Sequence, residues 1–164
     1  MSFTAAVVTV SDKGSRGERE DNSGDTLERL LKEAGAETVA REIVADEIKE
    51  IAKALRHFSE RGGAVDLIVT TGGTGLTPRD VTPEATLSVI ERQAPGFAEA
   101  IRAGSMQITP RAMLSRAVSG IRGCTLILNF PGSPKACEES FAIVRPALGH
   151  ALEMLGSTGG ECAR

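Results

Sequence analysis

Residues 65–86 read VDLIVTTGGTGLTPRDVTPEAT, and this stretch decides the fold class. It begins with an apolar, β-branched run at 65–70, which predicts a buried strand. A glycine-rich turn follows, and Thr82 with Pro83 then predicts the start of a helix, because proline is pre-organised for the first helical position. A strand that passes through a turn into a helix is the repeating unit of a parallel sheet.

The rest of the chain repeats this alternation. Further strands are predicted over the apolar runs Phe3–Val10, Glu37–Val44 and Cys124–Phe130. Helices are predicted over Leu27–Ala34 and Ile48–Leu55, where apolar residues recur at helical spacing. Residues 84–118 are predicted to be helical in pieces, with breaks at Pro95-Gly96 and near Pro110. A last helix is predicted after Pro134, with Pro146 kinking or dividing it. This order predicts an α/β fold, a three-layer α/β/α sandwich with a mostly parallel sheet.

Local signals predict where loops and helices begin. The polar stretch 11–25 is rich in turn residues and predicts a loop. Asn22 or Ser23 is expected to cap the helix that follows, with Gly35 just past its end. Asp46 stands where the N-cap of the next helix is expected.

The composition is typical of a globular protein. The chain has 164 residues, 41% hydrophobic and 25% charged, from which we predict one domain over residues 1–155 and a flexible tail over 156–164. No apolar run is long enough to span a bilayer, and residues 1–10 are typical of a strand rather than a signal peptide. Nineteen Lys and Arg against 22 Asp and Glu, with no Trp or Tyr, argue against a nucleic-acid-binding surface.

Cysteine and histidine are too sparse for a disulfide framework or a zinc site. The three cysteines, Cys124, Cys137 and Cys162, form no closely spaced pair, and the chain has only two histidines. This usage favours a reducing, cytoplasmic setting.

Polar segments follow the predicted strands where parallel sheets bind ligands. The segments 11–23, 45–46, 71–82 and 131–135 hold glycines, acids and hydroxyls that suit a phosphate site. Known phosphate loops do not fit Gly72-Gly73-Thr74-Gly75, because no lysine follows it and Pro78 takes the place of the last glycine of a dinucleotide motif. What remains is a glycine-rich turn whose amides can approach an anion, beside Arg79 and Asp80.

Three strings of the sequence together carry a family resemblance. They are TTGGTGLTPRDVTPEAT at 70–86, VTVSD at 8–12 and LILNFPGSPK at 126–135. They closely resemble the molybdenum-cofactor biosynthesis family of the MogA/MoaB kind, also seen in the G domain of gephyrin. The resemblance covers nearly the whole chain and implies an α/β/α sandwich that assembles as a homotrimer or homohexamer. It also implies an activity, molybdopterin adenylyltransferase, which uses ATP and Mg²⁺.

The resemblance assigns the catalytic residues. The family's two functional aspartates correspond to Asp46 and Asp80, which are expected to be both catalytic and metal-binding, since Mg²⁺ takes one or two carboxylates with phosphate oxygens and water. The family often has proline before the first aspartate, where this chain has Ala45, so a slightly looser turn is expected. The expected substrate-binding residues are Ser11, Asp12, Gly72, Gly73, Thr74, Gly75, Arg79, Pro131, Gly132 and Ser133.

The expected reaction joins the terminal phosphate of molybdopterin to the α-phosphate of ATP and expels pyrophosphate. The nucleophile is already an anion, so no strong base is required, and positioning and charge neutralisation should dominate. The nearest candidate cations are Lys13, Arg16, Arg79 and Lys135. Arg16 and Arg19 lie within an alternating charge run, which favours a solvated role for both.

Other interpretations stay open at this point. The protein could be a non-catalytic molybdopterin carrier or scaffold of the same pathway, or a nucleotide pyrophosphatase of the competence-damage type. Asp46 could be only a helix cap, and Ser11 and Asp12 could simply close a turn. The resemblance further suggests a downstream molybdenum insertase as a partner.

Overall fold

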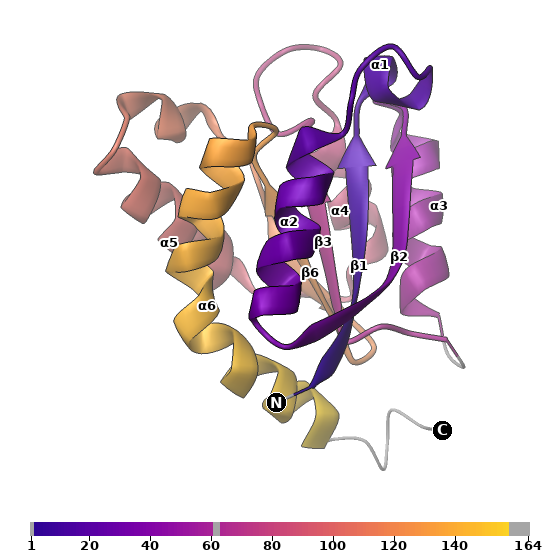
Figure 1. The fold of residues 1–164 in the computed structure, drawn as a ribbon, viewed down its shortest axis with the longest axis vertical. Helices are drawn as coiled ribbons and strands as arrows, with labels where there is room; N and C mark the ends of the chain where they lie inside the picture. The colour runs from indigo at the N-terminus through magenta and orange to yellow at the C-terminus, as the bar shows by residue number, and fades with distance from the viewer. Residues whose placement is uncertain (1, 61–62, 158–164) are drawn as a thin grey trace.

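The computed structural model describes residues 2–60 and 63–157 of the chain. In chain order the elements are β1 (Phe3–Val10), α1 (Asp12–Ser15), α2 (Asn22–Glu33), β2 (Ala36–Val44), α3 (Ile48–Ser59), β3 (Leu67–Thr71), α4 (Thr82–Val89), β4 (Arg92–Gln93), α5 (Pro95–Met106), the 3₁₀ helix η1 (Pro110–Leu114), β5 (Ser119–Arg122), β6 (Thr125–Phe130) and α6 (Pro134–Ser157). Figure 1 shows their arrangement.

A six-stranded mixed sheet forms the centre of the molecule, in the order β2-β1-β3-β6-β5-β4. Strands β2, β1, β3 and β6 are parallel, whereas β5 and β4 each run antiparallel to their neighbour. The predicted α/β fold with a mostly parallel sheet is therefore confirmed. Strands β4 and β5 were not predicted, because two and four residues carry too little periodicity to be recognised without the partner strand.

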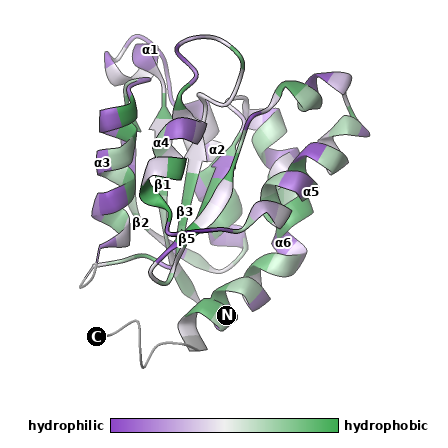
Figure 2. Cartoon of the chain, turned by 180° about the vertical axis from the view of Figure 1, so that it is seen from behind, coloured by the Kyte–Doolittle hydropathy of each residue, from purple (hydrophilic) through white to green (hydrophobic). Residues whose placement is uncertain are grey.

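Helices cover both faces of the sheet, so the three-layer architecture is also confirmed (Figures 1 and 2). Alternate side chains of β1 enter the two cores. One core joins Phe3, Ala5 and Val7 to Leu27 and Leu31 of α2, Ile101 of α5 and Phe141 of α6. The other joins Ala6, Val8 and Val10 to Ile51 and Leu55 of α3 and Val89 of α4. Burial on both faces explains why β1, β3 and β6 are mostly apolar, whereas the edge strand β2 is largely exposed.

Two predicted helix caps are wrong. Asp21 caps α2 in place of Asn22 or Ser23, and its side chain accepts a hydrogen bond from the Gly24 amide. Glu47, with no side-chain cap bond, occupies the N-cap position of α3 that was predicted for Asp46. The carboxylate of Asp46 is therefore left for another role.

Further boundaries also differ from the prediction. The predicted loop 11–25 contains α1 and the start of α2. Pro95 begins α5 rather than interrupting a helix, and Pro146 lies within the single helix α6. Gly35 ends α2 with a φ of 92°, as predicted. Residues 156–157 belong to α6, and the rest of the predicted tail lies outside the described residues.

The described part of the chain has no helix long and apolar enough to cross a membrane. Cys137 is a buried free thiol. Cys162 lies outside the described residues.

Candidate active site

The four parallel strands end at the same edge of the sheet. In the register, Val10 of β1 lies beside Val44 of β2, and Thr9 lies beside Thr71 of β3. Thr71 in turn lies beside Phe130 of β6. The polar segments that follow these strands therefore meet at one edge, as the ligand rule for parallel sheets predicts (Figure 1, top).

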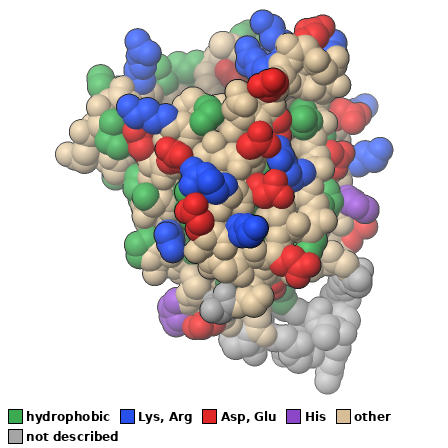
Figure 3. All heavy atoms as spheres, viewed as in Figure 1, with side chains coloured by type: hydrophobic (Ala, Val, Ile, Leu, Met, Phe, Trp, Pro, Cys, Tyr) green, Lys and Arg blue, Asp and Glu red, His purple; other side chains and the backbone are tan. Residues whose placement is uncertain are grey.

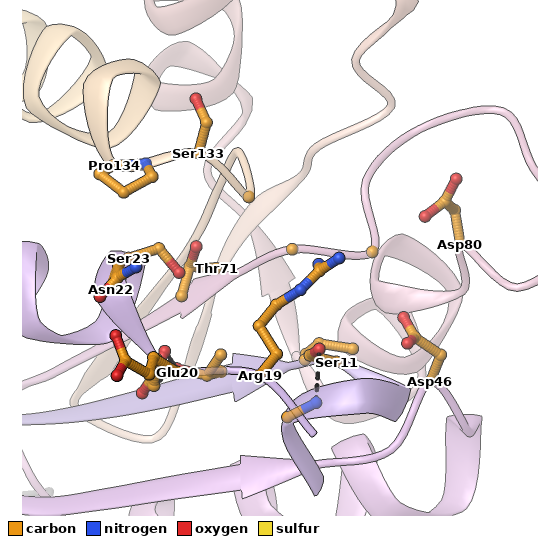
Figure 4. Close-up of a pocket in the computed structure, with 17 residues that line it drawn as sticks. Ser11, Arg19, Glu20, Asn22, Ser23, Asp46, Thr71, Asp80, Ser133 and Pro134 are labelled. Atoms are coloured by element: carbon orange, nitrogen blue, oxygen red, sulfur yellow. Dashed lines mark hydrogen bonds between the residues drawn. The ribbon is translucent and has the colours of Figure 1, made fainter. Parts of the chain in front are cut away.

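A cavity of about 640 Å³ opens at this edge, a size suited to a small-molecule ligand (Figure 4). The cavity is lined by residues that end β1 and β3, begin α2 and α6, and follow β2. They are Thr9, Val10, Ser11, Gly14, Arg19, Glu20, Asp21, Asn22, Ser23, Asp46, Thr71, Gly72, Gly73, Asp80, Gly132, Ser133 and Pro134.

Two glycines let the turn after β3 lie against the end of β1. Gly72 has a φ of 95°, and a Cβ there would lie 2.4 Å from the carbonyl oxygen of Val10. Gly73 has a φ of 67°, and its Cβ would lie 2.3 Å from Oγ1 of Thr82. That hydroxyl donates to the Gly72 carbonyl. No other residue type fits this approach without a backbone shift.

Two turns that line the cavity carry backbone amides without a protein acceptor among the described residues. Within the described residues, the amides of Gly73, Gly132 and Ser133 donate to no protein acceptor. Ser133 caps α6, because its Oγ accepts from the Ala136 amide. Free amides at the positive end of a long helix bind anions, and phosphate above all.

Asp46 follows β2 and is held by the turn after β1. Its Oδ2 accepts from the Asp12 amide at 2.8 Å, and its own amide donates to Asp12 Oδ1 at 3.0 Å. Within the described residues no donor contacts Asp46 Oδ1, which lies 3.3 Å from the position of a Cβ on Gly73. Burial raises the pKa of Asp46, and the nearby charges of Asp12 and Asp80 add to this effect.

Asp80 lies on the opposite loop and is held by Thr77. Its Oδ2 accepts from the Thr77 amide at 2.9 Å and from Thr77 Oγ1 at 2.7 Å. Oδ1 accepts no hydrogen bond within the described residues. Figure 4 shows Asp80 and Asp46 on the same side of the cavity. Each carboxylate thus keeps one oxygen available at the same cavity.

This donor set can be compared with the needs of a metal ion. The described residues contain no group of three or more His, Cys, Asp or Glu side chains placed to hold one. Mg²⁺ needs no such cage, because one or two carboxylates, phosphate oxygens and water complete its shell. Two carboxylates with an available oxygen each therefore fit Mg²⁺ bound together with phosphate, and do not fit a structural metal held by protein alone.

Asp12 and Arg79 bind each other beside the cavity. Arg79 Nε donates to Asp12 Oδ2 at 3.0 Å, and Nη2 donates to Asp12 Oδ1 at 2.9 Å. Its third nitrogen, Nη1, donates to Glu47 at 2.8 Å. The Arg79 guanidinium lowers the pKa of Asp12. Neither side chain lines the cavity, and Arg79 instead lines an adjoining hollow with Asp46 and Glu47.

The cavity brings together most of the predicted site residues. Those that line it are Asp46, Asp80, Ser11, Gly72, Gly73, Gly132 and Ser133, and those that do not are Asp12, Thr74, Gly75, Arg79 and Pro131. The carbonyl of Pro131 accepts from Thr71 Oγ1 at 2.7 Å and from Cys137 Sγ at 3.1 Å. These two hydrogen bonds fix Pro131 and with it the turn that places Gly132 at the cavity.

Arg19 lines the cavity although a solvated role was expected for it. Figure 4 shows its side chain projecting into the cavity, and no protein partner contacts its guanidinium within the described residues. Arg16, from the same charge run, pairs instead with Glu18 at 3.0 Å. The other candidate cations, Lys13 and Lys135, do not line the cavity. Charge alternation alone did not distinguish Arg16 from Arg19.

The start of α2 also belongs to the site: it lies within the segment 11–23 expected to suit phosphate, although none of its residues was among the expected substrate-binding residues. Asp21 accepts from Thr9 Oγ1 at 2.9 Å and from Arg41 Nη2 at 2.8 Å, which places Asn22 and Ser23 at the cavity wall. The sequence signal that could have found this part of the site is Asp21, an acid directly before a helix. Its place at the site is evident only from the structure, where Arg41 of β2 pairs with it.

Comparisons with known proteins agree with this geometry. Residues 6–150 match the family described as "Probable molybdopterin binding domain". The chain is 41% identical over 151 residues to the molybdopterin adenylyltransferase of Helicobacter pylori, covering 91% of this chain and 85% of that protein. It is 43% identical over 156 residues to the molybdenum cofactor synthesis protein cinnamon of Drosophila melanogaster, covering 94% of this chain and 26% of that protein.

Comparison with a solved structure identifies the same family. The crystal structure of the molybdopterin biosynthesis enzyme MoaB from Thermus thermophilus matches with a TM-score of 0.89 at 49% identity, covering 94% of this chain and 97% of that one. The resemblance to the MogA/MoaB kind is thereby confirmed. Matched over most of its length in sequence and in structure, this chain belongs to the molybdopterin-binding domain family of molybdenum-cofactor biosynthesis.

Proposed function

We propose that this protein is a molybdopterin adenylyltransferase, which transfers AMP from ATP to the terminal phosphate of molybdopterin and releases pyrophosphate. The observation that carries the proposal is the pair Asp46 and Asp80, each with one available carboxylate oxygen at a cavity that also offers free amides and Arg19. The Helicobacter relative, 41% identical over 91% of this chain, bears the name of this activity.

The chemistry asks for positioning rather than for a base. A phosphate oxygen of molybdopterin attacks the α-phosphorus of ATP, and the bond from that phosphorus to the bridging oxygen of the β-phosphate breaks. The electron pair of that bond leaves with pyrophosphate. Because the attacking oxygen is already an anion, the residues of the site need only align two anions and neutralise their repulsion.

The site residues divide this work. Asp46 and Asp80 would hold Mg²⁺, which when bound neutralises phosphate charge. The amides of Gly73, Gly132 and Ser133 bind phosphate oxygens, aided by the positive end of α6. Arg19 would supply a cation at the cavity wall.

The test is an assay with Mg-ATP, with and without molybdopterin, that follows pyrophosphate and AMP. We expect pyrophosphate only when molybdopterin is present. Asp46→Asn and Asp80→Asn should each abolish it while circular dichroism and the unfolding midpoint stay near wild type. Asp66→Asn is the matched control, because Asp66 lies before β3 at the opposite edge of the sheet, where it accepts from Thr4. An Asp46 or Asp80 variant that turns over at the wild-type rate would remove that residue from the mechanism.

The same assay separates the other functions. Molybdopterin binding without pyrophosphate would identify a carrier or scaffold, and ATP hydrolysis independent of molybdopterin would identify a pyrophosphatase. The two available carboxylates argue against a carrier, since binding molybdopterin alone does not require a pair of metal ligands. Either of those results would overturn the proposal.

Self-association belongs to the same proposal. Large apolar side chains are exposed around the end of α5 and in η1, namely Met106, Ile108, Met113 and Leu114. Figure 3 shows hydrophobic side chains along this side of the molecule. Exposed apolar side chains that lie close together are typical of a protein–protein interface, so this surface of α5 and η1 supports a homotrimer or homohexamer that buries it. Met113→Glu should lower the mass measured by sedimentation, because Met113 is 60% exposed in the single chain.

The setting of the reaction completes the proposal. A cytoplasmic location and a molybdenum insertase that receives adenylylated molybdopterin suit this activity. Fractionation of cells and co-purification with an insertase test the two statements separately.

A further inference from the structure

Arg116 lies outside the cavity and was not singled out by any sequence signal. It follows η1 and precedes β5, and its guanidinium reaches the loop 72–81 that joins β3 to α4. Nε donates to the carbonyl of Gly75 at 2.8 Å, and Nη2 donates to the carbonyl of Asp80 at 2.5 Å. The backbone amide of Arg116 also donates to the carbonyl of Thr74 at 2.8 Å. One residue therefore binds the loop at both ends of the segment 74–80.

The segment 74–80 depends on these contacts because it has few other hydrogen bonds to the rest of the protein. Three hydrogen bonds within it join Thr77 to Asp80: the Asp80 amide donates to the Thr77 carbonyl at 3.0 Å, and the Thr77 amide and Oγ1 both donate to Asp80 Oδ2. These bonds fix Asp80 relative to Thr77 but do not fix the pair relative to the sheet. The pair is fixed relative to the sheet by Arg79, which binds Asp12, and by Arg116.

Glu84 holds the guanidinium in place. It lies in the first turn of α4, and its carboxylate accepts from Nη1 of Arg116. The same ion pair lowers the pKa of Glu84. The guanidinium thus has a different acceptor for each of its three nitrogens: two loop carbonyls and one carboxylate on a helix that is packed into the core.

From this geometry we propose that Arg116 is a positioning residue for adenylyl transfer, which acts by fixing the carbonyls of Gly75 and Asp80 so that the Asp80 carboxylate stays on the same side of the cavity as Asp46. Arg116 touches no substrate in this account. Its kinetic consequences rest on the proposed function, but its effect on the loop does not.

Arginine is specifically suited to this task. The three acceptors lie around one planar group whose donors have fixed directions, and a lysine ammonium cannot reach all three. Arg116→Lys should therefore keep the charge opposite Glu84 and still fail to restore the loop. Arg116→Gln removes both the positive charge and the planar guanidinium that donates to all three acceptors.

The first experiment measures the loop in the ligand-free protein. Amide hydrogen exchange of Thr77 and Asp80 should accelerate about tenfold or more in Arg116→Gln, because the bonds that hold the segment to the protein are lost. Amides in β1 and β6 should exchange at wild-type rates, which separates local loosening from general destabilisation. Glu84→Gln should give a smaller increase, since the carbonyl contacts remain.

The second experiment measures steady-state kinetics with molybdopterin and Mg-ATP. Arg116→Gln and Arg116→Lys should lower kcat about 10- to 100-fold, the range expected when a reacting group moves by about 1 Å. KM for molybdopterin should stay within about threefold of wild type, because the groups proposed to bind it do not contact Arg116. The Mg²⁺ concentration that gives half-maximal rate should rise.

Arg102→Gln is the matched control. Arg102 of α5 also donates to carbonyls of this connecting segment, to Ala117 at 2.7 Å and to Ser115 at 3.4 Å, but it does not contact the loop 72–81. Its loss should loosen the segment without lowering kcat and without faster exchange at Asp80.

Each outcome decides something. Unchanged exchange at Thr77 and Asp80 in Arg116→Gln would overturn the inference, whatever the activity. Equal losses in Arg102→Gln and Arg116→Gln would also overturn it, because the effect would then be general destabilisation. An inactive wild-type protein with faster loop exchange in Arg116→Gln would instead remove the proposed function and leave the positioning of Asp80 in place.

Discussion

Replacing Gly72 with alanine tests how closely the turn after β3 must approach β1. Gly72 has a φ of 95°, which costs an L-residue roughly 1–2 kcal/mol. Its new Cβ would also lie 2.4 Å from the Val10 carbonyl oxygen, a backbone atom at the end of a central strand. Relieving that overlap requires a shift of the turn or the strand, which adds about 1–3 kcal/mol.

The expected loss in the free energy of unfolding is therefore about 2–5 kcal/mol for Gly72→Ala. Gly17→Ala provides the control, since Gly17 has a φ of 72° but its Cβ would meet nothing within 4 Å. It should cost only the backbone strain. The gain from a stiffer unfolded chain is similar at both positions and cancels in the comparison.

Urea unfolding at one protein concentration, followed by circular dichroism, measures both variants. For a chain of this size each kcal/mol lowers Tm by about 2–4 °C, so thermal unfolding offers a second readout. Gly72→Ala should also weaken activity, because the turn that it displaces carries cavity-lining atoms. Equal destabilisation of the two variants would refute the reasoning, since the close approach to Val10 would then have no energetic consequence.

Three further predictions follow from the same structure. Arg19→Gln should raise KM for one anionic substrate about tenfold, whereas Arg16→Gln should leave KM unchanged because Arg16 pairs with Glu18 away from the cavity. The Arg116 ion pair holds the pKa of Glu84 below its ordinary value of 4.5. The stabilisation from this pair is therefore present above pH 4.5 and is lost as the pH falls through the lowered pKa. Between about pH 6 and pH 3, the free energy of unfolding measured in urea should decrease less steeply in Glu84→Gln than in the wild type. Phe141→Ala should lower the free energy of unfolding by about 3–5 kcal/mol, because its ring is 2% exposed, and a loss under about 1 kcal/mol would contradict that packing.

Much of the fold could be predicted because its strands are buried on both faces. The runs at Phe3–Val10 and Cys124–Phe130 are mostly apolar, and burial in a parallel sheet explains this pattern locally. The strands β4 and β5 were not predicted because they are held by backbone pairing, β4 with β5 and β5 with β6, and such pairing leaves no pattern in so few residues.

The candidate site divides in a similar way. Asp46 and Asp80 were found through the strings that contain them, and the cavity contains both. Asp12 and Arg79 occur in the same strings, yet they bind each other and do not line the cavity. A motif identifies which residues gather at a turn, but it does not give the direction of each side chain.

The sequence by itself determined the alternation of strands and helices, the edge at which the polar segments meet and the two aspartates placed there, because each of these follows from local pattern or from short strings. Only the tertiary structure decided which carboxylate oxygens stay available, that Arg19 rather than Arg16 enters the cavity, and that Arg116 fixes a loop 36 to 41 residues away in the chain. Those features depend on contacts between distant segments, whose geometry is set by sheet register and helix packing rather than by any residue's neighbours in sequence.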